Sequence, residues 1–543
     1  MLDILPSFAS SDAVYNGKTL AERIAGRFYT PDNLAADLTE QMIRAFKMSG
    51  ARQAIDLIDP FCGDGRLVAA LLVRAADDSL LACSRWRIAL WDQDKRAVTD
   101  AKQHITDLAK SLGLPASVEM HAGDSFADRP REQFDLVITN PPWELLKPDH
   151  RELAHLSLAE RGQYKLRLRQ ISDELDKRFP DARGENAWGG WATNLARCGW
   201  DLSMRLLKPR GILGIVLPST LFADQSSERL RRCAFTNYRL IDMAAYPPEA
   251  RLFDRVDQPV VSVTMSANRQ DDRPALLRVF DAALCQKSSS KIGDRETLAE
   301  RGHSISVGFG ATAGEILDLL KPLPKLADLE GRDGAHLWLG RELDETRVSE
   351  KLTSGTDFPF IKGRMVNRHT IVETPTRSVR RELACRFDSI ARPRAVWRDV
   401  SRASQRRRMI GTVIPPGWVA GNSLHVGCYR DGDLRRTYAL HGILSSFVLE
   451  FQVRCRLATG HMSLGIVRDT HIPALDRRLE ERLGDEAMRL ATGARIEADR
   501  MEVLVARAYG LERDSFALLL DSFEKVTDDE KALLLDKRLW MKA

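Results

Sequence analysis

The sequence has few cysteines and no grouping of them that suits a metal ion. Its 543 residues include eight cysteines, which are scattered, form no Cys-x-x-Cys pair and have no clustered histidine partners. Neither a zinc site nor a disulfide framework is therefore indicated, and reduced, mostly buried thiols are the default. We expect no metal centre.

Long apolar runs are also missing. No uninterrupted stretch approaches membrane-spanning length, and the N-terminus lacks the basic and then apolar pattern of a signal peptide. We therefore expect a cytoplasmic protein that does not bind membranes. The net charge of +5 is small, and 543 residues are enough for two or three domains.

The most informative stretch joins an apolar run to a rigid turn. Residues 134–139 read as a buried strand, and Asn140, Pro141, Pro142 and Trp143 follow directly. Two consecutive prolines fix the backbone and lack N–H donors, so the carbonyl groups and the Asn140 side chain are left as rigid acceptors. A flat aromatic ring follows at once.

Such a turn suits an amino group on a planar ring, of which adenine N6 is an example. The Asn140 side-chain oxygen and the Pro141 carbonyl would each accept one N–H, while Trp143 stacks on the ring. Two fixed acceptors that draw the nitrogen toward tetrahedral geometry would free its lone pair for attack. The alternative is a structural turn after a buried strand, with an incidental tryptophan.

The three strands expected before this turn each end in a carboxylate, at Asp59, Asp92 and Asp124. The separations of 33 residues (92 − 59) and 32 residues (124 − 92) match a strand-helix-strand unit of roughly 30 residues. Because the carboxyl ends of parallel strands form the ligand crevice, the three aspartates should meet along one edge with Asn140. Taken singly, an aspartate at a strand end is more often a turn former or a helix cap.

Three motifs in this order resemble those of a known family. Asp-Pro-Phe-Cys-Gly-Asp-Gly (59–65) resembles the first cofactor motif of S-adenosylmethionine-dependent methyltransferases, and Asn-Pro-Pro-Trp (140–143) resembles the catalytic motif of N6-adenine DNA methyltransferases. Phe-Tyr-Thr-Pro (28–31) is similar to the N-terminal cofactor motif of the gamma class. The resemblance implies an α/β fold, a Rossmann-like methyltransferase sheet with helices on both faces, followed by a mixed α+β C-terminal recognition domain and a helical tail.

The resemblance also implies S-adenosyl-L-methionine as the cofactor. Asp92 would hold its ribose, Asp124 its adenine amino group, and Phe126 would line that pocket, while residues 29, 30 and 61–63 would surround the methionine part. The expected cofactor-binding residues are Tyr29, Thr30, Asp59, Phe61, Cys62, Gly63, Asp92, Asp124 and Phe126.

The target base would be held by a second group of residues. Residues 252–260 resemble the late motif whose phenylalanine packs on the second face of a flipped base, which makes Phe253 the candidate. A core phenylalanine before a strand is the alternative for this residue. The expected catalytic residues are Asn140, Pro141, Pro142, Trp143 and Phe253.

Composition and motif order divide the chain into segments. Residues 1–270 are expected to form the methyltransferase domain, with a helical insertion at 144–190, and residues 271–300 a linker region. Residues 301–475 would form the DNA target-recognition domain, and residues 476–543 a C-terminal helical segment. The insertion either remains a solvated helix or, lying beside the site, closes over the substrate or touches phosphates.

Arginine is concentrated in part of the second domain. Residues 364–408 contain 13 arginines and four acidic residues, a net charge of +9 where the whole chain has +5. Localised arginine of this density suits a phosphate backbone, and arginine can also bind guanine edges with two hydrogen bonds. A merely solvated arginine-rich face is the alternative.

The tail has a helical seam. Small and apolar residues from Leu483 to Ala508 recur at steps of three and four, which predicts one helix that Gly510 ends, followed by a shorter pair. Because the seam is rich in alanine and short, we expect it to pack within the chain rather than in a coiled-coil dimer.

Together these features predict a site-specific adenine N6-methyltransferase that acts on a flipped base in double-stranded DNA. It would be the modification component of a bacterial restriction or phage-defence system, associated with the nucleoid, with restriction activity on a separate subunit. The alternatives are an RNA or protein-glutamine methyltransferase and a DNA-binding specificity subunit of a larger complex.

Overall fold

The computed structural model of the chain describes most residues after position 29. They are residues 30–48, 50, 52–127, 134–148, 153, 156–184, 193–253, 258–268, 273–293, 295–300, 302–307, 310–330, 337–345, 352–354, 357–401, 405–457, 462–492 and 498–542. The chain divides into two compact units, residues Met1–Ala311 and Thr312–Ala543.

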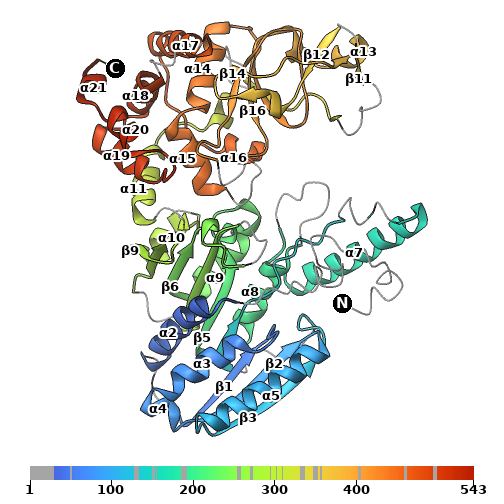
Figure 1. Ribbon diagram of the computed structural model, residues 1–543, viewed down its shortest axis with the longest axis vertical. Helices are drawn as coiled ribbons and strands as arrows, with labels where there is room; N and C mark the ends of the chain where they lie inside the picture. The colour runs from blue at the N-terminus through green and yellow to red at the C-terminus, as the bar shows by residue number, and fades with distance from the viewer. Residues whose placement is uncertain are drawn as a thin grey trace. The chain divides into compact units, whose positions relative to one another are not determined.

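One sheet organises the first unit (Figure 1). Within the described residues it has nine strands in the order β3-β2-β1-β4-β5-β7-β6-β8-β9. The first five run parallel, and β7 lies antiparallel between β5 and β6. The strands are β1 (Ala54–Asp59), β2 (Arg85–Asp92), β3 (Ala116–Ala122), β4 (Phe134–Thr139), β5 (Leu207–Pro218), β6 (Arg239–Tyr246), β7 (Val260–Ser266), β8 (Leu276–Phe280) and β9 (Gln286–Lys291).

This strand order creates a switch point between β1 and β4. The chain runs outward from β1 through β2 to β3 and then returns to β4 on the other side of β1. In open α/β sheets, ligands bind outside the carboxyl ends of the strands at such a point. The segment 271–300, which we expected to link two domains, contributes β8 and β9 to the same sheet and the helix α10 (Arg295–Glu300).

Helices cover both faces of the sheet, and this confirms the predicted fold class. One apolar core lies under α2, α3 and α5 and includes Met42, Leu71 and Ile105. A second core lies on the other face under α8 and α9 and includes Trp200 and Phe235. The helices are α2 (Asp32–Met48), α3 (Arg66–Ala76), α4 (Ser79–Ala82), α5 (Lys95–Ser111), α8 (Leu195–Arg205) and α9 (Glu228–Asn237).

The insertion contains the helix expected there, α7 (Leu158–Arg178). It begins with a capping box, in which the Ser157 side chain accepts from the Glu160 N–H and the Glu160 carboxylate accepts from the Ser157 N–H. In Figure 1 the helix extends away from the sheet of its own unit. Most of its residues are exposed or half-buried.

The second unit is a mixed α+β structure, as predicted. Its described residues form sheets in the orders β10-β19-β16-β17 and β11-β15-β12-β18, with a small β13-β14 ribbon. The strands are β10 (Leu337–Gly340), β11 (Leu352–Thr353), β12 (Phe358–Ile361), β13 (Val366–Asn367), β14 (Thr370–Ile371), β15 (Ser378–Val379), β16 (Arg394–Arg398), β17 (Gly411–Ile414), β18 (Val419–Ala420) and β19 (Leu424–Tyr429).

Helices make up the rest of this unit. At its start, α11 (Gly310–Leu320) crosses the boundary between the two units. The later helices are α13 (Arg381–Ala384), α14 (Leu434–Leu444), α15 (Phe447–Arg456), α16 (Leu464–Arg468), α17 (Arg477–Ala491), α18 (Ala498–Ala508), α19 (Arg513–Asp521), α20 (Asp528–Leu534) and α21 (Lys537–Lys542). No helix in the described part of the chain combines the length and the apolar character needed to cross a bilayer.

The tail seam is divided between two helices, so the prediction of one continuous helix was wrong. Thr492 caps α17, whereas α18 begins only at Ala498. Both helices pack against α14 within the unit. Gly510, with φ of +77°, follows α18 as predicted, and three short helices follow in place of the expected pair.

A buried ion pair joins separate segments of the second unit. The Glu342 carboxylate accepts from Arg394 (2.8 Å), from the Ser389 hydroxyl (2.7 Å) and from the Ala420 N–H (2.7 Å). Neither charged side chain is exposed to solvent, and Arg394 also donates to the Trp418 carbonyl. Since both charges have several partners, the pair holds this fold together once it has formed.

We expect Glu342→Ala to lower the free energy of unfolding by about 3–5 kcal/mol, because it leaves the Arg394 charge buried without its partner. Urea unfolding measures the change. Glu373→Ala is the control, since it removes only an exposed pair with Arg364 and should cost less than about 1 kcal/mol. Equal losses in the two variants would contradict the structural role of Glu342.

Candidate active site

The carboxyl ends of β1 and β4 are joined by a side-chain hydrogen bond. The hydroxyl of Thr139, the last residue of β4, donates to Oδ1 of Asp59, the last residue of β1, at 2.7 Å. The same oxygen accepts the Phe61 N–H at 3.0 Å. These two bonds fix the turn after β1 against the strand that leads into Asn140.

Asp92 continues the same edge from β1 to β2 and β3. Its Oδ2 accepts the Gly63 N–H at 2.9 Å, and its backbone carbonyl accepts the Gly123 N–H at 2.9 Å. Gly63 has φ of +52°, a conformation that glycine adopts at little cost. Asp124 accepts the Phe126 N–H at 3.0 Å. The three strand-end aspartates therefore line one edge, while their roles toward a cofactor stay a prediction.

Asp59 differs from the other two aspartates in its burial. It is 1% exposed, and this burial raises the pKa of its carboxyl to about 7. The hydrogen bonds from Thr139 and Phe61 oppose the rise, and the charge of Asp92 adds to it. Burial likewise raises the pKa of Cys62, which keeps its thiol protonated. Asp59 is therefore a buried residue that holds the turn after β1 through its hydrogen bonds with Thr139 and Phe61.

The Asn140 amide is held by a residue far away in the sequence. Its Nδ2 donates to the Thr30 hydroxyl at 3.2 Å. The Thr30 carbonyl accepts from Arg66 at 3.0 Å, and Arg66 is paired with Asp64 at 2.7 Å. The structure thus brings two of the expected site residues into contact, while Tyr29 lies outside the described residues. Sequence reasoning missed Arg66, whose only signal is its place after the glycine turn.

The start of α8 holds the Asn140 turn through backbone hydrogen bonds. The Leu146 N–H donates to the Thr193 carbonyl at 2.9 Å, and the Leu195 N–H donates to the Glu144 carbonyl at 2.8 Å. The segment after the proline pair therefore cannot shift without breaking contacts to the start of the helix.

Gly199, one turn further along α8, touches the first proline. A Cβ at this position would lie 2.4 Å from Pro141 Cβ and 3.4 Å from a ring carbon of Phe61. Only glycine permits this approach of the helix to the buried Pro141, whereas Pro142 is half-buried. A glycine inside a helix carries no sequence signal of what it contacts, so this residue was not foreseen.

Trp143 and Phe253, expected on the two faces of a base, lie in direct contact. Their ring centroids are 5.1 Å apart and their planes are inclined by 71°. Phe253 is 4% exposed and belongs to the core on the α2 face, so the core interpretation of this residue also holds. The Trp143 indole N–H is buried and has no acceptor among the described residues.

A second aromatic group packs around Phe126, which lies close to Asp124 in the sequence. The rings of Phe61 and Phe126 have centroids 5.1 Å apart, and those of Phe126 and Phe179 5.8 Å apart. Phe179 follows α7, and Arg178 donates to the Phe126 carbonyl at 3.1 Å. The end of the insertion therefore packs against Phe126; the sequence placed the insertion beside the site but did not identify this contact. No cluster of three or more His, Cys, Asp or Glu residues able to hold a metal occurs in the described residues.

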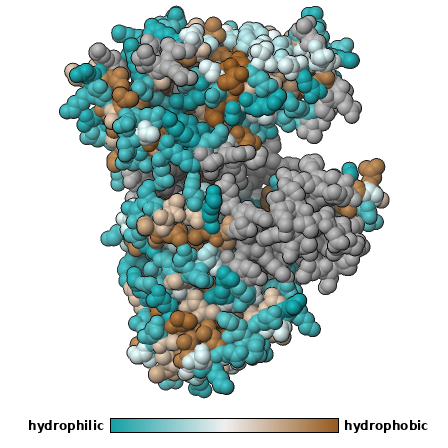
Figure 2. Space-filling model, viewed as in Figure 1, coloured by the Kyte–Doolittle hydropathy of each residue, from teal (hydrophilic) through white to brown (hydrophobic). Residues whose placement is uncertain are grey.

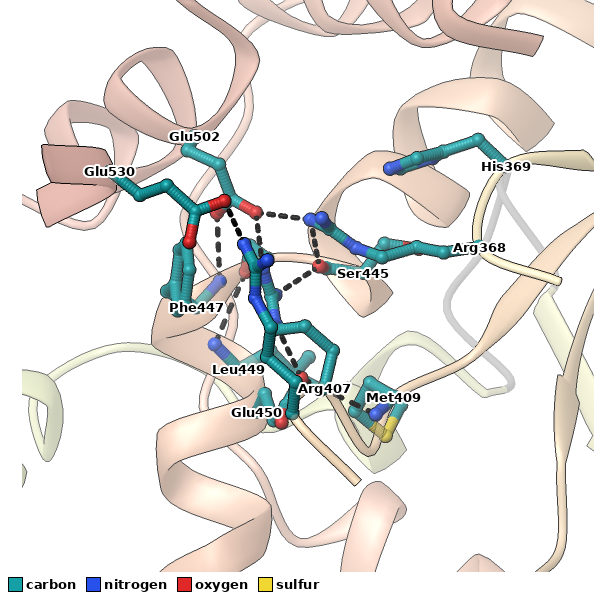
Figure 3. A network of polar contacts seen from close by, with 12 residues as sticks. Arg368, His369, Arg407, Met409, Ser445, Phe447, Leu449, Glu450, Glu502 and Glu530 are labelled. Atoms are coloured by element: carbon teal, nitrogen blue, oxygen red, sulfur yellow. Dashed lines mark hydrogen bonds and ion pairs between the residues drawn. The ribbon is translucent and has the colours of Figure 1, made fainter. Parts of the chain in front are cut away.

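Several arginines of the second unit form ion pairs in its interior rather than at its surface. Arg407 is paired with Glu450 (2.8 Å) and Glu502 (3.0 Å), and it lies 3.7 Å from the Phe447 ring centroid (Figure 3). Arg368 is also paired with Glu502. Although burial opposes its ionisation, the neighbouring arginines lower the pKa of Glu450 to about 2.

The arginine-rich stretch therefore exposes less charge than its composition indicates. Arg368, Arg394 and Arg407 are in ion pairs with buried carboxylates, and Arg398 donates to a backbone carbonyl. Arg402 lies outside the described residues. The exposed arginines are Arg364, Arg377, Arg380, Arg381, Arg386 and Arg406, of which the first and last are paired with Glu373 and Glu530.

Comparison with known proteins supports a methyltransferase domain in the first unit. Residues 27–159 match the family described as RMKL-like, methyltransferase domain. The type II methyltransferase M.BanIII of Aneurinibacillus aneurinilyticus is 22% identical over 236 residues, which cover 41% of this chain and 36% of the relative. M.VspI of Vibrio sp. (strain 343) is 22% identical over 213 residues, 39% of this chain and 41% of the relative. The matches thus span less than half the length of these relatives.

The fold also resembles that of a restriction-modification enzyme. A structure of the type IIL restriction-modification enzyme MmeI in complex with DNA has a TM-score of 0.51 and 9% identity, with 93% of this chain and 76% of that chain covered. At this identity the likeness concerns the fold alone. The family match includes Thr30, the strands β1 to β4 and the Asn140 turn.

We expect Asp59→Asn to remove a pH-dependent loss of stability. Because the pKa of Asp59 is raised to about 7, the folded chain keeps a proton that the unfolded chain has released. The free energy of unfolding should therefore fall by up to about 4 kcal/mol as the pH rises from about 4 to 7, and stay lower above 7. Asparagine keeps the acceptor for Thr139 and Phe61 but cannot ionise, so this slope should vanish.

Urea unfolding between pH 5 and pH 8 measures the slope in each protein. Asp100→Asn removes an exposed carboxylate of α5 and should keep the wild-type slope. If Asp59→Asn followed the wild-type curve, the carboxyl of Asp59 would not titrate as described.

Proposed function

We propose that this chain is an S-adenosylmethionine-dependent, site-specific DNA methyltransferase that modifies N6 of an adenine flipped out of the duplex. The turn after β4 is the observation that carries the proposal. The Asn140 amide donates to Thr30, and Pro141 packs closely against Gly199 of α8. The rings of Trp143 and Phe253 are in contact at the end of the turn. The turn ends a strand at the switch point of the sheet, where such folds bind ligands.

The edge beside this turn suits a cofactor with a ribose, a purine and a charged amino acid. Backbone N–H groups of Gly63 and Asp94 donate to the two carboxylate oxygens of Asp92, which orients them and leaves lone pairs for ribose hydroxyls. Asp124 would hold the purine amino group, with Phe61 and Phe126 as apolar walls. When bound, S-adenosylmethionine supplies an electrophilic methyl group.

The residues of the turn would prepare the amine. Asn140 Oδ1 and the Pro141 carbonyl would each accept one N–H of adenine N6, and so free its lone pair to attack the methyl carbon in line. The bound cofactor would supply the methyl group and keep the electron pair of the C–S bond, while the Asn140 turn would hold the amine in line with it. The methylated N6 is strongly acidic until it loses its extra proton, so water or Asn140 suffices to accept it.

The aromatic pair has to part for a base to enter. Rings stacked on both faces of a base stand about 7 Å apart, whereas the centroids of Trp143 and Phe253 are 5.1 Å apart with inclined planes. We infer that Trp143, which is half-buried, turns onto the base while the buried Phe253 stays in the core. Stacking would offset the cost of flipping, a few kcal/mol.

The second unit would recognise the DNA sequence. Four exposed arginines around β15 and α13 are the candidates for phosphate contacts there: Arg377, Arg380, Arg381 and Arg386. We infer that the chain is the modification component of a restriction or phage-defence system, in which a separate subunit supplies any nuclease.

We expect Asn140→Ala to lower kcat by roughly 100-fold to 1,000-fold, because one of the two acceptors for the amine is lost. Binding of duplex DNA and of S-adenosylmethionine should change little. Mass spectrometry of nucleosides from a methylated duplex pool measures the N6-methyladenine formed. Asn237→Ala, in α9, is the control and should keep wild-type activity. Wild-type rates in Asn140→Ala, or a modified base other than N6-methyladenine, would contradict the proposal.

We expect Gly199→Ala to lower kcat by roughly 100-fold, because the new methyl group would push Pro141 out of position and a displacement of about 1 Å has that effect. Gly162→Ala is a matched control, since a Cβ at that helical position meets no atom within 4 Å. It should keep full activity and gain up to about 1 kcal/mol of stability. Initial rates and thermal unfolding of both variants provide the comparison, and an active Gly199→Ala would refute the positioning role.

A further inference from the structure

Charge is divided unequally along α7. Residues 158–169 contain four basic residues and one acidic residue, a net charge of +3, and residues 170–178 contain two basic and three acidic residues, a net charge of −1. We call residues 158–169 the basic half of the helix. Its basic residues are Arg161, Lys165, Arg167 and Arg169.

The other half of α7 is built into the active-site wall. Its Ser172 hydroxyl lies 2.5 Å from the Thr193 hydroxyl, which also donates to Asp176 at 2.9 Å. Arg178 donates to the Phe126 carbonyl. These contacts fix the second half of α7 to the first unit, and in Figure 1 the helix extends from there away from the sheet.

The basic half has little support from the rest of the protein. Tyr164 is buried against Leu153, but Leu166 is 60% exposed. Lys165 and Arg167 are exposed and form no ion pair with any described residue. Many of the residues that Figure 2 colours are hydrophilic, so exposed charge alone does not indicate a ligand.

The spacing of these cations has an energetic cost. Arg161 and Lys165, and then Lys165 and Arg169, are four residues apart and are therefore neighbours on the helix surface. Like charges at this spacing destabilise an isolated helix by about 0.2–0.5 kcal/mol per pair. An anionic ligand laid along the helix would remove the repulsion, and phosphates on a nucleic acid strand form such a row.

We propose that the basic half of α7 binds the phosphate backbone of the duplex that presents the target base. The inference rests on the proposed function, because a DNA substrate gives the row of anions that this surface fits. The helix would extend the contact area of the first unit beyond the flipped base, and it would add affinity without sequence preference. Its role differs from that of the second unit, which would select the site.

The double variant Lys165→Gln/Arg169→Gln removes two exposed cations that lie four residues apart on one face of α7, and it tests this inference. Each phosphate contact contributes about 0.9 to the slope of log affinity against log salt, so the slope for duplex DNA should fall by about 1.8. The Kd should rise at low salt and converge with the wild-type value as salt increases. The kcat at saturating DNA should stay unchanged, since neither residue touches the reacting atoms.

Lys177→Gln removes one cation from the acidic half and is the matched control, with the wild-type salt slope expected. Circular dichroism and cofactor binding check that each variant is folded. A wild-type slope in the double variant, an equal fall in the control, or tighter binding of RNA than of duplex DNA would overturn the inference. If the wild-type chain bound no DNA, both this inference and the proposed function would be wrong. If the wild-type chain bound DNA but the double variant kept its salt slope, only this inference would be wrong.

Discussion

The hydrogen bond from Thr139 to Asp59 is the contact on which the site depends. It joins the last residues of β4 and β1 at the switch point of the sheet, so the glycine turn and the Asn140 turn keep a fixed separation. The buried carboxyl that accepts this bond can be protonated at neutral pH because burial raises its pKa to about 7. The carboxyl ends of β1 and β4 are therefore held together by a hydrogen bond to Asp59, whose charge depends on pH near neutrality.

Helices then hold the Asn140 turn at this edge. Backbone hydrogen bonds to the start of α8 and the close approach of Gly199 to Pro141 fix it from one side, and Thr30 at the head of α2 holds the Asn140 amide from the other. Fixed acceptors of this kind are how a protein can act on an amine without a strong base. The same logic explains why α7 ends in an aromatic residue against Phe126: the insertion shares a wall with the site.

The sequence predicted the parts of the fold that follow from local patterns. Apolar runs that end in a carboxylate identified β1 and β2, the regular spacing of Asp124 identified β3, which ends two residues before it, and the Asn-Pro-Pro-Trp turn identified the end of β4. It could not identify Arg66, Gly199 or Phe179, because their roles come from contacts between segments far apart in the chain. It also overstated the surface charge of the second unit, because the partners that bury Arg394 and Arg407 lie more than 40 residues away in the sequence. The sequence also did not predict that the tail divides into α17 and α18. The apolar residues keep the same spacing in both helices, so the pattern alone gives no sign of where α17 ends.

A structure of the chain with a duplex oligonucleotide and S-adenosylhomocysteine, the product form of the cofactor, tests the central claim most directly. We expect an adenine outside the helix stack, with its N6 about 3 Å from both Asn140 Oδ1 and the Pro141 carbonyl and with Trp143 turned onto its ring. A duplex with every base stacked beside the crevice, or a cofactor bound away from Asp92, would contradict it.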